Sequence, residues 1–385
     1  MNADERRCAL ALSRMGYHNI TVLRELYNAW DSMADIVKQH AHPEQLAPNM
    51  PERLLAAFAH TDEHLKRADE EMRFAQDNNI SIITLADEAY PQRLKACFDA
   101  PLALFFKGNA NLNAKHCISI VGTRKATPYA ADCIAQLTAR LKQLCPDILI
   151  VSGLAYGVDI MAHRQAIDHA LPTVAVLAHG LDTLYPSRHR KEATLMMQNG
   201  GLLTEYFSQS KIDKRNFLQR NRIVAGMSAA TLLVESAEHG GGLVTCRLAQ
   251  SYQHDVFAFP GNINNPYSVG CNRLIRDNMA GLVTSAEDIL KAMAWEEDIK
   301  ETVATNGASS MGSSVLGATS ASTAKVPNGA QSVLDVLTKE NDLHIDIIAT
   351  RAGLPVNKVL ALLFQLEMSG MVSSLSGGRY HKVNS

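Results

Sequence analysis

The chain has 385 residues, which is long for one domain and indicates two or three domains of ordinary size. Hydrophobic residues make up 46% and charged residues 20%, as in an ordinary globular protein. The net charge of -2 excludes a protein that binds polyanions through bulk charge, so any contact with nucleic acid must come from a local basic patch.

The cysteines and the N-terminal residues indicate the cellular compartment in which we expect the protein. Seven cysteines fall at irregular spacing with no C-x-x-C pair, which is typical of reduced, buried thiols in a reducing cytoplasm. The start MNADERRC lacks an apolar signal region, and no apolar stretch approaches the ~20 residues of a membrane span. We therefore expect a cytoplasmic protein with no membrane contact.

Residues 1–75 show apolar side chains at helical spacing and no strand pattern, which predicts a helical N-terminal domain. The segment 14–27 is compatible with a helix-turn-helix around Gly16, whose backbone amides would then touch a phosphate. A plain helical bundle is the favoured interpretation, because one glycine between helices is a weak signal.

Residues 80–297 predict an α/β core with an extended Rossmann-like, mostly parallel sheet and helices on both faces, because short apolar runs alternate with helix-length segments. The apolar runs are 80–85, 117–121, 148–151, 173–178, 201–204, 230–235, 256–259 and 281–283.

Residues 302–327 are dominated by Ser, Thr, Ala and Gly, which predicts a flexible linker. Residues 329–385 then form a small unit with helices expected near 331–339, 344–352 and 356–369, followed by a Gly-Gly hairpin. This order is typical of a winged-helix domain.

Four glycine-bearing segments follow apolar runs of the core, at 120–127, 150–159, 232–245 and 256–263. Turns at the carboxyl ends of parallel strands open on one edge of a sheet, where helix N-termini present free amides to anions. The sequence therefore predicts a long phosphate-binding rim rather than one nucleotide pocket.

The first two glycine segments offer few side chains for chemistry. Arg124 follows Gly122 in a turn and either binds a phosphate or is a plain surface arginine. We expect Thr127 and Asp159 to cap the helices that follow, and His163 to be a core or capping residue.

The segment 211–222 places five basic side chains around Phe217, a combination that holds single-stranded nucleic acid by stacking bases and pairing phosphates. The alternative is a basic helix that packs Phe217 into the core. The glycines of 239–245 precede a helix expected to start near Val244, and three in a row permit close backbone approach to a ligand.

Several enzyme signatures are absent from the sequence: a P-loop, an H-E-x-x-H, a Cys/His metal spacing and a G-x-S-x-G elbow. Glu205 and Glu235, at predicted strand ends, are the carboxylates we consider for catalysis. We expect no cofactor, no metal and no catalytic residue.

Taken in order, the motifs over about 80–290 closely resemble the DprA/Smf DNA-processing family. They are AYPQRLKACFDAPLALFFKGN (89–109), VGTRKAT, VSGLAYGVD, AHGLDTLYP, FLQRNRIVAGMS, HGGGLVT, PGN and SVGCNRLI. The resemblance implies an extended Rossmann-like core, a helical N-terminal domain, a winged-helix C-terminal domain and a homodimer. It also implies binding of single-stranded DNA and loading of the RecA recombinase during natural transformation.

By the same resemblance, a set of residues is expected to contact DNA: Arg124, Ser152, Gly153, Lys214, Phe217, Arg220, Asn221, Arg222, Gly240, Gly241 and Gly242. The four basic residues of this set would neutralise phosphates, Phe217 would stack on a base, and the glycine turns would supply amides. The chain departs from the family pattern at Tyr156, where a basic residue is common, at His239 and Gly242, which replace serines, and at 278–281.

The resulting hypothesis is a non-enzymatic protein that protects single-stranded DNA and passes it to RecA. An alternative is a nucleotide phosphoribohydrolase with a related Rossmann-like core, although its P-G-G-x-G-T-x-x-E signature is replaced here by PGNINNPY (260–267). A third is a protein-interaction scaffold that binds DNA incidentally.

Overall fold

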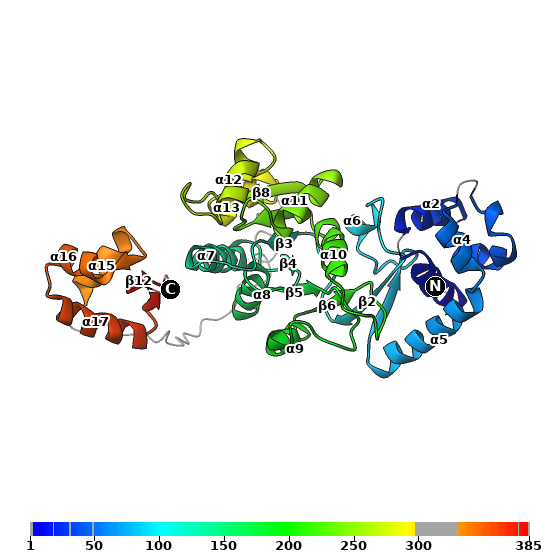
Figure 1. Cartoon of the computed structure of the whole chain (residues 1–385), viewed down its shortest axis with the longest axis horizontal. Coiled ribbons are helices and arrows are strands. Elements are labelled where there is room, and N and C mark those ends of the chain that lie inside the picture. Colours follow the sequence, from blue (N-terminus) through cyan, green and yellow to red (C-terminus); the bar gives the residue numbers. More distant parts are fainter. Residues whose placement is uncertain are drawn as a thin grey trace, which may run out of the picture. The chain divides into compact units, whose positions relative to one another are not determined.

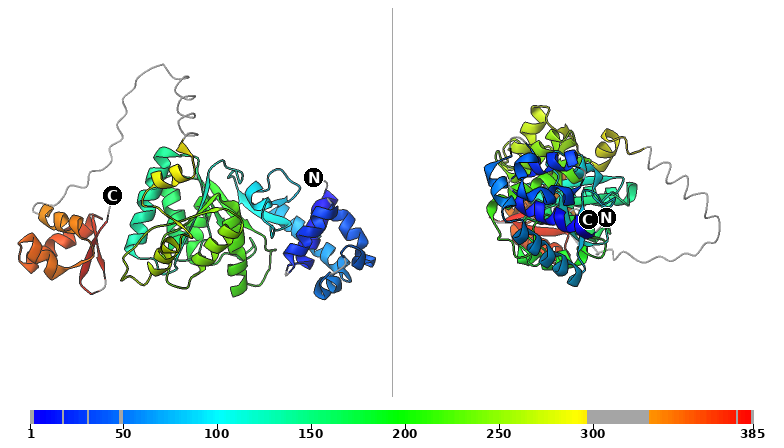
Figure 2. Two further views of the ribbon diagram at one scale, coloured as in Figure 1. Left: turned by 90° about the horizontal axis from the view of Figure 1, so that it is seen from above. Right: turned by 90° about the vertical axis from the view of Figure 1, so that its right-hand side faces the viewer.

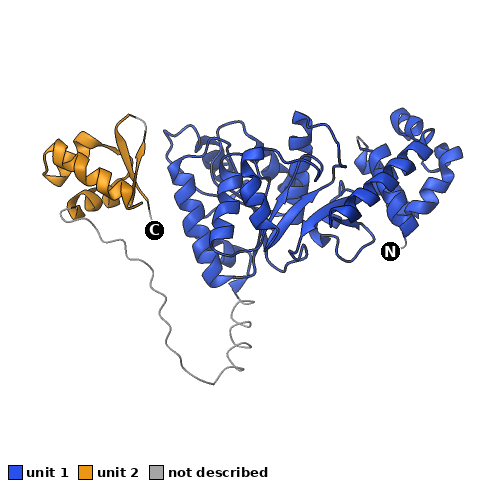
Figure 3. Cartoon of the chain, turned by 90° about the horizontal axis from the view of Figure 1, so that it is seen from below, with its two compact units in different colours: residues 1–301 blue, residues 302–385 orange. Residues whose placement is uncertain are grey.

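The structure, a computed structural model, describes residues 3–17, 19–30, 32–47, 50–296, 330–375 and 377–383. The chain divides into two compact units, Met1–Glu301 and Thr302–Ser385 (Figure 3). The predicted linker at 302–327 lies outside the described residues.

The N-terminal part of the first unit is helical, as predicted, and its described residues before Ser81 form no strand (Figure 2). Its α-helices are α1 (Ala3–Met15), α2 (Ile20–Trp30), α3 (Met33–Lys38), α4 (Glu52–Phe58) and α5 (Thr61–Asp77). Gly16 lies between α1 and α2, and a Cβ there would lie 2.2 Å from Cδ1 of Leu23. The glycine thus allows close packing of two helices, which suits the helical-bundle interpretation.

One nine-stranded sheet forms the centre of this unit, in the order β1-β2-β6-β5-β4-β3-β7-β8-β9. The strands are β1 (Ser81–Thr84), β2 (Ala103–Gly108), β3 (Cys117–Val121), β4 (Leu149–Ser152), β5 (Thr173–Val176), β6 (Gly200–Thr204), β7 (Ala230–Leu233), β8 (Asp255–Ala258) and β9 (Gly281–Leu282). From β6 to β9 the pairing is parallel throughout, which confirms the predicted sheet.

Strand β2 is absent from the predicted set. It pairs antiparallel with both β1 and β6 and so joins the segment after the N-terminal helices to the parallel sheet. Its residues Ala103–Phe106 are all buried, so the strand shows no alternation of polar and apolar residues that would reveal it.

Helices cover both faces of the sheet, as predicted (Figure 1). One face packs against α7 (Pro128–Leu144), α8 (Val158–Asp168), α9 (Arg190–Met196) and α13 (Ala286–Ala292). The other packs against α6 (Gln92–Lys95), α10 (Lys214–Met227), α11 (Gly241–Ser251) and α12 (Val269–Arg276). Strand β3 lies between β4 and β7, so the order of strands reverses there, which is the ligand-binding position of an open α/β sheet.

The second unit has the winged-helix order that the sequence predicts. Its helices are α15 (Gln331–Lys339), α16 (Ile345–Ala352) and α17 (Val356–Met368), and its sheet has the order β10 (Leu343–His344), β12 (Arg379–Lys382), β11 (Val372–Leu375). Helix α17 buries Val359, Leu363 and Leu366 in the core of this unit. Its other side exposes Leu360, Phe364 and Met368.

Across the described residues, no single helix has both the length and the apolar composition needed to cross a membrane. The pair α16 and α17 meets the requirement only when counted together and is bent by 107°, with the buried side of each helix in the core of the winged-helix domain.

The fully buried His163 on α8 makes the stability of the first unit depend on pH. Its Nδ1 lies 2.8 Å from Oγ1 of Thr173, and burial, aided by Arg220 and His189, lowers its pKa to about 3. The unfolded chain, with an ordinary histidine pKa of about 6.5, binds this proton more readily. His163 therefore costs stability as the pH falls below about 6.5 towards 3.

We expect His163→Gln, which cannot titrate, to lose less free energy of unfolding than the wild type between pH 7 and pH 5, by up to about 2 kcal/mol. Urea unfolding of both proteins at both pH values measures the difference. An identical pH dependence would contradict the argument, whatever the variant costs at pH 7.

Candidate nucleic-acid interface

Three of the four glycine segments, 120–127, 150–159 and 232–245, meet in one hollow at the carboxyl ends of β3, β4 and β7, which we call the rim pocket. The fourth segment, 256–263, does not line it. Its volume is about 320 Å³. The predicted residues that line it are Arg124, Gly153, Phe217, Arg220, Asn221, Gly240, Gly241 and Gly242. The fold thus brings together most of the predicted DNA-contacting set.

Two helices begin beside this pocket without a side-chain cap. Helix α11 follows Gly240, so its first amides are left to solvent or to a ligand. Helix α8 follows Gly157, but the amides of Val158 and Ile160 already donate to the carbonyl oxygens of Thr123 and Ala155. Gly157 has φ +77°, and a Cβ there would lie 2.2 Å from the carbonyl oxygen of Thr123. The expected cap Asp159 is instead the second residue of α8, and α11 begins at Gly241 rather than near Val244.

Phe217 and Arg124 form the accessible part of the rim pocket. Phe217 is half-buried, and the exposed Arg124 guanidinium carbon lies 5.7 Å from its ring centroid. Tyr185 meets the same ring edge-on at 5.7 Å between centroids. Phe217 is therefore not a core residue, and the exposed Arg124 guanidinium lies over its ring. Sequence reasoning missed Tyr185, whose signal is the aromatic residue near the end of AHGLDTLYP.

Arg220 lines the rim pocket but is buried, which does not support the predicted contact of its guanidinium with a phosphate. It is 3% exposed, and its Nη1 donates to the carbonyl oxygens of Gly153, at 2.6 Å, and Val176. Burial lowers its pKa, an effect that the nearby Asp159 opposes. Because its Nη1 serves two strand ends, Arg220 supports the floor of the pocket.

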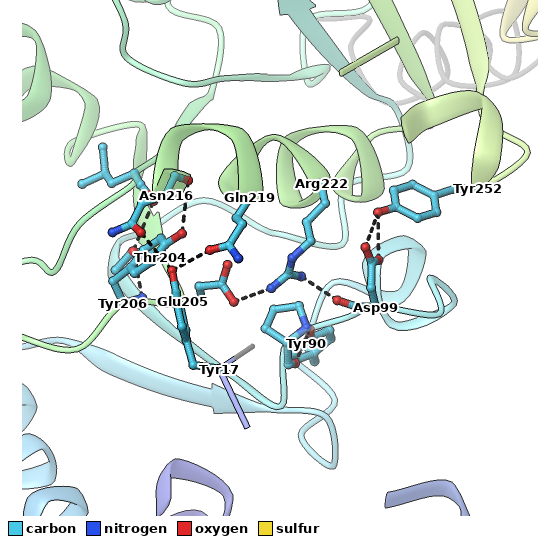
Figure 4. A network of polar contacts seen from close by, with 12 residues as sticks. Tyr17, Tyr90, Asp99, Thr204, Glu205, Tyr206, Asn216, Gln219, Arg222 and Tyr252 are labelled. Atoms are coloured by element: carbon cyan, nitrogen blue, oxygen red, sulfur yellow. Dashed lines mark hydrogen bonds and ion pairs between the residues drawn. The ribbon is translucent and has the colours of Figure 1, made fainter. Parts of the chain in front are cut away.

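Arg222 likewise differs from the prediction, because it points to the opposite side of α10 (Figure 4). It is 6% exposed, with Nη1 donating to the Asp99 carbonyl at 2.6 Å and Nη2 to the Glu205 carboxylate. Burial would lower the pKa of Arg222, but Glu205 and Asp99 outweigh it and raise that pKa. The pair is a buried structural ion pair, out of reach of a strand in the rim pocket.

Ser152 and Lys214 also lie outside the lining of the rim pocket. Ser152 is fully buried, and its hydroxyl donates to the Ile120 carbonyl at 2.6 Å, so the predicted contact of its side chain with DNA is not supported. Lys214 is the exposed first residue of α10. It precedes Phe217 by three residues and therefore lies on the same side of the helix.

The two candidate carboxylates for catalysis both have structural partners. Glu205 binds Arg222. Glu235 accepts hydrogen bonds from the Thr127 amide at 2.9 Å and from its hydroxyl at 2.6 Å, so Thr127 stands at the start of α7 but donates instead of capping. Burial raises the pKa of Glu235, and these two hydrogen bonds oppose the rise. No group of three or more His, Cys, Asp or Glu in the described chain could hold a metal ion.

Comparison with protein-family models places this geometry in context. The model for DNA recombination-mediator protein A matches residues 81–294, which contain the whole rim pocket. The model for the DprA winged helix domain matches residues 317–378.

Known proteins and structures agree with these matches. Protein Smf of Escherichia coli is 33% identical over 318 residues, covering 81% of this chain and 80% of that protein. The X-ray structure of DNA processing protein A (DprA) from Streptococcus pneumoniae superposes with a TM-score of 0.62 at 30% identity, covering 73% of this chain and 95% of that one. DprA from Helicobacter pylori, whose single-stranded DNA binding mode has been described structurally, superposes with a TM-score of 0.51 at 29% identity. The match covers 56% of this chain and 96% of that one.

The two arginines Arg222 and Arg124 should respond differently to removal. We expect Arg222→Ala to destabilise the first unit by about 3 to 5 kcal/mol, because the Glu205 carboxylate would remain buried without its partner. Arg124→Ala, at an exposed turn, should change stability by less than about 0.5 kcal/mol. Urea unfolding measures both, and equal stability of the two variants would refute the assignment of Arg222.

Proposed function

Because the chain belongs to the DNA recombination-mediator protein A family, also called DprA/Smf, we propose that it binds single-stranded DNA along the rim pocket. The observation that carries this proposal is the exposed Arg124 guanidinium over the half-buried ring of Phe217, with the uncapped start of α11 in the same pocket. Stacking and phosphate pairing in one groove are what single-stranded nucleic acid requires.

Different groups around the rim pocket bind different parts of the DNA strand. Arg124 neutralises a phosphate in the pocket, and Lys214 pairs with a second at the start of α10. The first amides of α11 donate to phosphate oxygens. Phe217 stacks on a base. Arg220 and Arg222 stay bonded to carbonyl groups of the protein and keep α10 in position. Because these contacts involve phosphates and ring faces, the site tolerates any base sequence.

The family likeness also supports a place in recombination. We propose that the protein protects single-stranded DNA without catalysis and helps to load RecA, acting as a homodimer during natural transformation. The structural partners of Glu205 and Glu235 favour this non-enzymatic role over the phosphoribohydrolase alternative. The seven free thiols favour a cytoplasmic location.

Arg124 and Phe217 allow the binding site to be tested by two distinct signatures. Arg124→Ala should reduce the slope of log affinity against log salt by about 0.7 on single strands, because one phosphate contact is lost. Phe217→Ala should cost about 1 to 3 kcal/mol of binding free energy through lost stacking and leave the slope nearly unchanged. Fluorescence anisotropy with labelled oligothymidine over a range of salt concentrations measures both quantities.

Circular dichroism and thermal melting must first show that these variants are folded. Arg188→Ala, which removes an exposed arginine that does not line the rim pocket, is the matched control and should keep the wild-type slope. Normal binding by Phe217→Ala together with a wild-type slope for Arg124→Ala would refute the rim pocket as the DNA site.

The winged-helix domain makes a separate prediction. Its helix α17 exposes Leu360, Phe364 and Met368 and has Lys358 as its one basic residue, so it lacks the charge of a groove-reading helix. We expect deletion of 329–385 to leave the single-strand affinity within a few-fold of the wild type. A large loss, measured in the same anisotropy assay, would make the winged helix a principal DNA site.

A further inference from the structure

A second hollow lies where the N-terminal helices meet the core, and we call it the junction pocket. Its volume is about 750 Å³, more than twice that of the rim pocket. One wall comes from α1, α2, α4 and α5, and the other from the start of β2, residues 205–211 and Asn216 of α10. None of the functional assignments above uses this pocket.

Basic side chains dominate the charged lining of the junction pocket. Arg14, Arg53, Arg67 and Lys211 line it, whereas its acidic lining consists of Glu205. Glu205 is already neutralised by Arg222, and Arg67 is bound by Glu71. Arg53 and Lys211 are exposed and belong to none of the ion pairs found among the described residues. The pocket therefore presents uncompensated positive charge at its mouth.

The interior of the junction pocket is apolar and aromatic. Met15, Leu23, Leu102 and Ala103 are buried residues of its lining. Tyr17 and Tyr206 stand beside them with ring centroids 5.8 Å apart, and the Tyr17 hydroxyl lies within hydrogen-bonding distance of the Gln219 and Asn216 side-chain oxygens, at 2.6 Å and 3.0 Å. A planar ring suits this interior and an anionic group suits the mouth, which together describe a nucleotide.

Helix α10 connects the two pockets. Asn216 lines the junction pocket and the next residue, Phe217, lines the rim pocket, while Lys214 is exposed one turn earlier. A strand that stacks on Phe217 can therefore pass the start of α10, where the exposed Lys214 and Arg215 outnumber the acidic Asp213, and reach the junction pocket.

We propose that the junction pocket is a second nucleotide subsite for the same single strand, in which Arg53 and Lys211 pair with phosphates and the aromatic interior receives a base. This inference rests on the proposed function of the rim pocket. It gives the N-terminal helices a direct part in DNA binding.

The length of the bound strand provides the test. An oligothymidine of about 6 nucleotides occupies the rim pocket alone, and one of about 20 reaches both pockets. With the long strand, Arg53→Ala should reduce the salt slope by about 0.7, and the double variant Arg53→Ala/Lys211→Ala by about 1.4. With the short strand, both variants should bind like the wild type.

Two reference variants distinguish a failure of the junction-pocket proposal from a failure of the proposed function. Arg73→Ala removes an exposed arginine of α5 that does not line the junction pocket, and it should change neither slope. Arg124→Ala should reduce the slope with both strands. If it does so while Arg53→Ala/Lys211→Ala behaves like Arg73→Ala on the long strand, the junction pocket is not a subsite and the rim pocket stands. If Arg124→Ala changes neither slope and Phe217→Ala binds normally, the proposed function itself fails.

A free nucleotide has the same ring and phosphate as a strand and is the alternative ligand for the junction pocket. Thymidine 5′-monophosphate binding to the wild type, with long-strand slopes unaffected by Arg53→Ala/Lys211→Ala, would overturn the strand path and assign the pocket to a free ligand. Calorimetric titration supplies this comparison.

Discussion

The buried charge of Arg222 fixes the helix on which the candidate DNA contacts depend. Its guanidinium joins the Asp99 carbonyl, before β2, to the Glu205 carboxylate, after β6. Tyr252, the residue after α11, donates to the Asp99 carboxylate at 2.8 Å. Separating these groups would leave an uncompensated charge in the interior, so α10 cannot rotate or slide without a large cost. The opposite side of α10 is thereby set as well. Phe217 and Asn221, four residues apart, stay on the rim pocket, with Lys214 one turn before them.

Arg220 imposes a related constraint on the floor of the rim pocket. A Cβ at position 153 would lie 2.2 Å from its Nη1, so the glycine after β4 is required for the guanidinium to reach two strand ends. The carbonyl oxygens and the nearby Asp159 share its charge. Of the two arginines that line the rim pocket, only Arg124 is therefore left exposed to a ligand. Local electrostatics explain how a chain of net charge -2 can present a site for a polyanion.

The predictions from sequence succeeded where the pattern is local and failed where a partner is distant. Apolar runs and the glycines after them located β3, β4 and β7 and the rim between them, and the Gly-Gly hairpin located the wing. The roles of Arg220 and Arg222 could not be predicted from local patterns. The sequence of 211–222 does not distinguish an arginine in a surface patch from one in a buried ion pair. Arg220 lies four residues before the buried Val224, which was a usable hint that it faces inward. The partners of Arg222 lie 17 and 123 residues away in the chain, beyond any local pattern.

The start of α10 carries an electrostatic cost that binding would relieve. Lys214 and Arg215 occupy the first turn, where the positive end of the helix dipole disfavours a cation by about 0.3 to 1 kcal/mol. Asp213 offsets part of this cost by accepting a hydrogen bond from the Arg215 amide at 2.8 Å. Lys211 adds a further positive charge on the side of the junction pocket. A phosphate bound here would offset the repulsion between these cations and the helix dipole, and it would also attract each cation. Its stabilising effect would therefore exceed that of a single ion pair. Asn216 lines the junction pocket and Phe217 lines the rim pocket, so a strand bound as we propose would pass this helix start on its way between them.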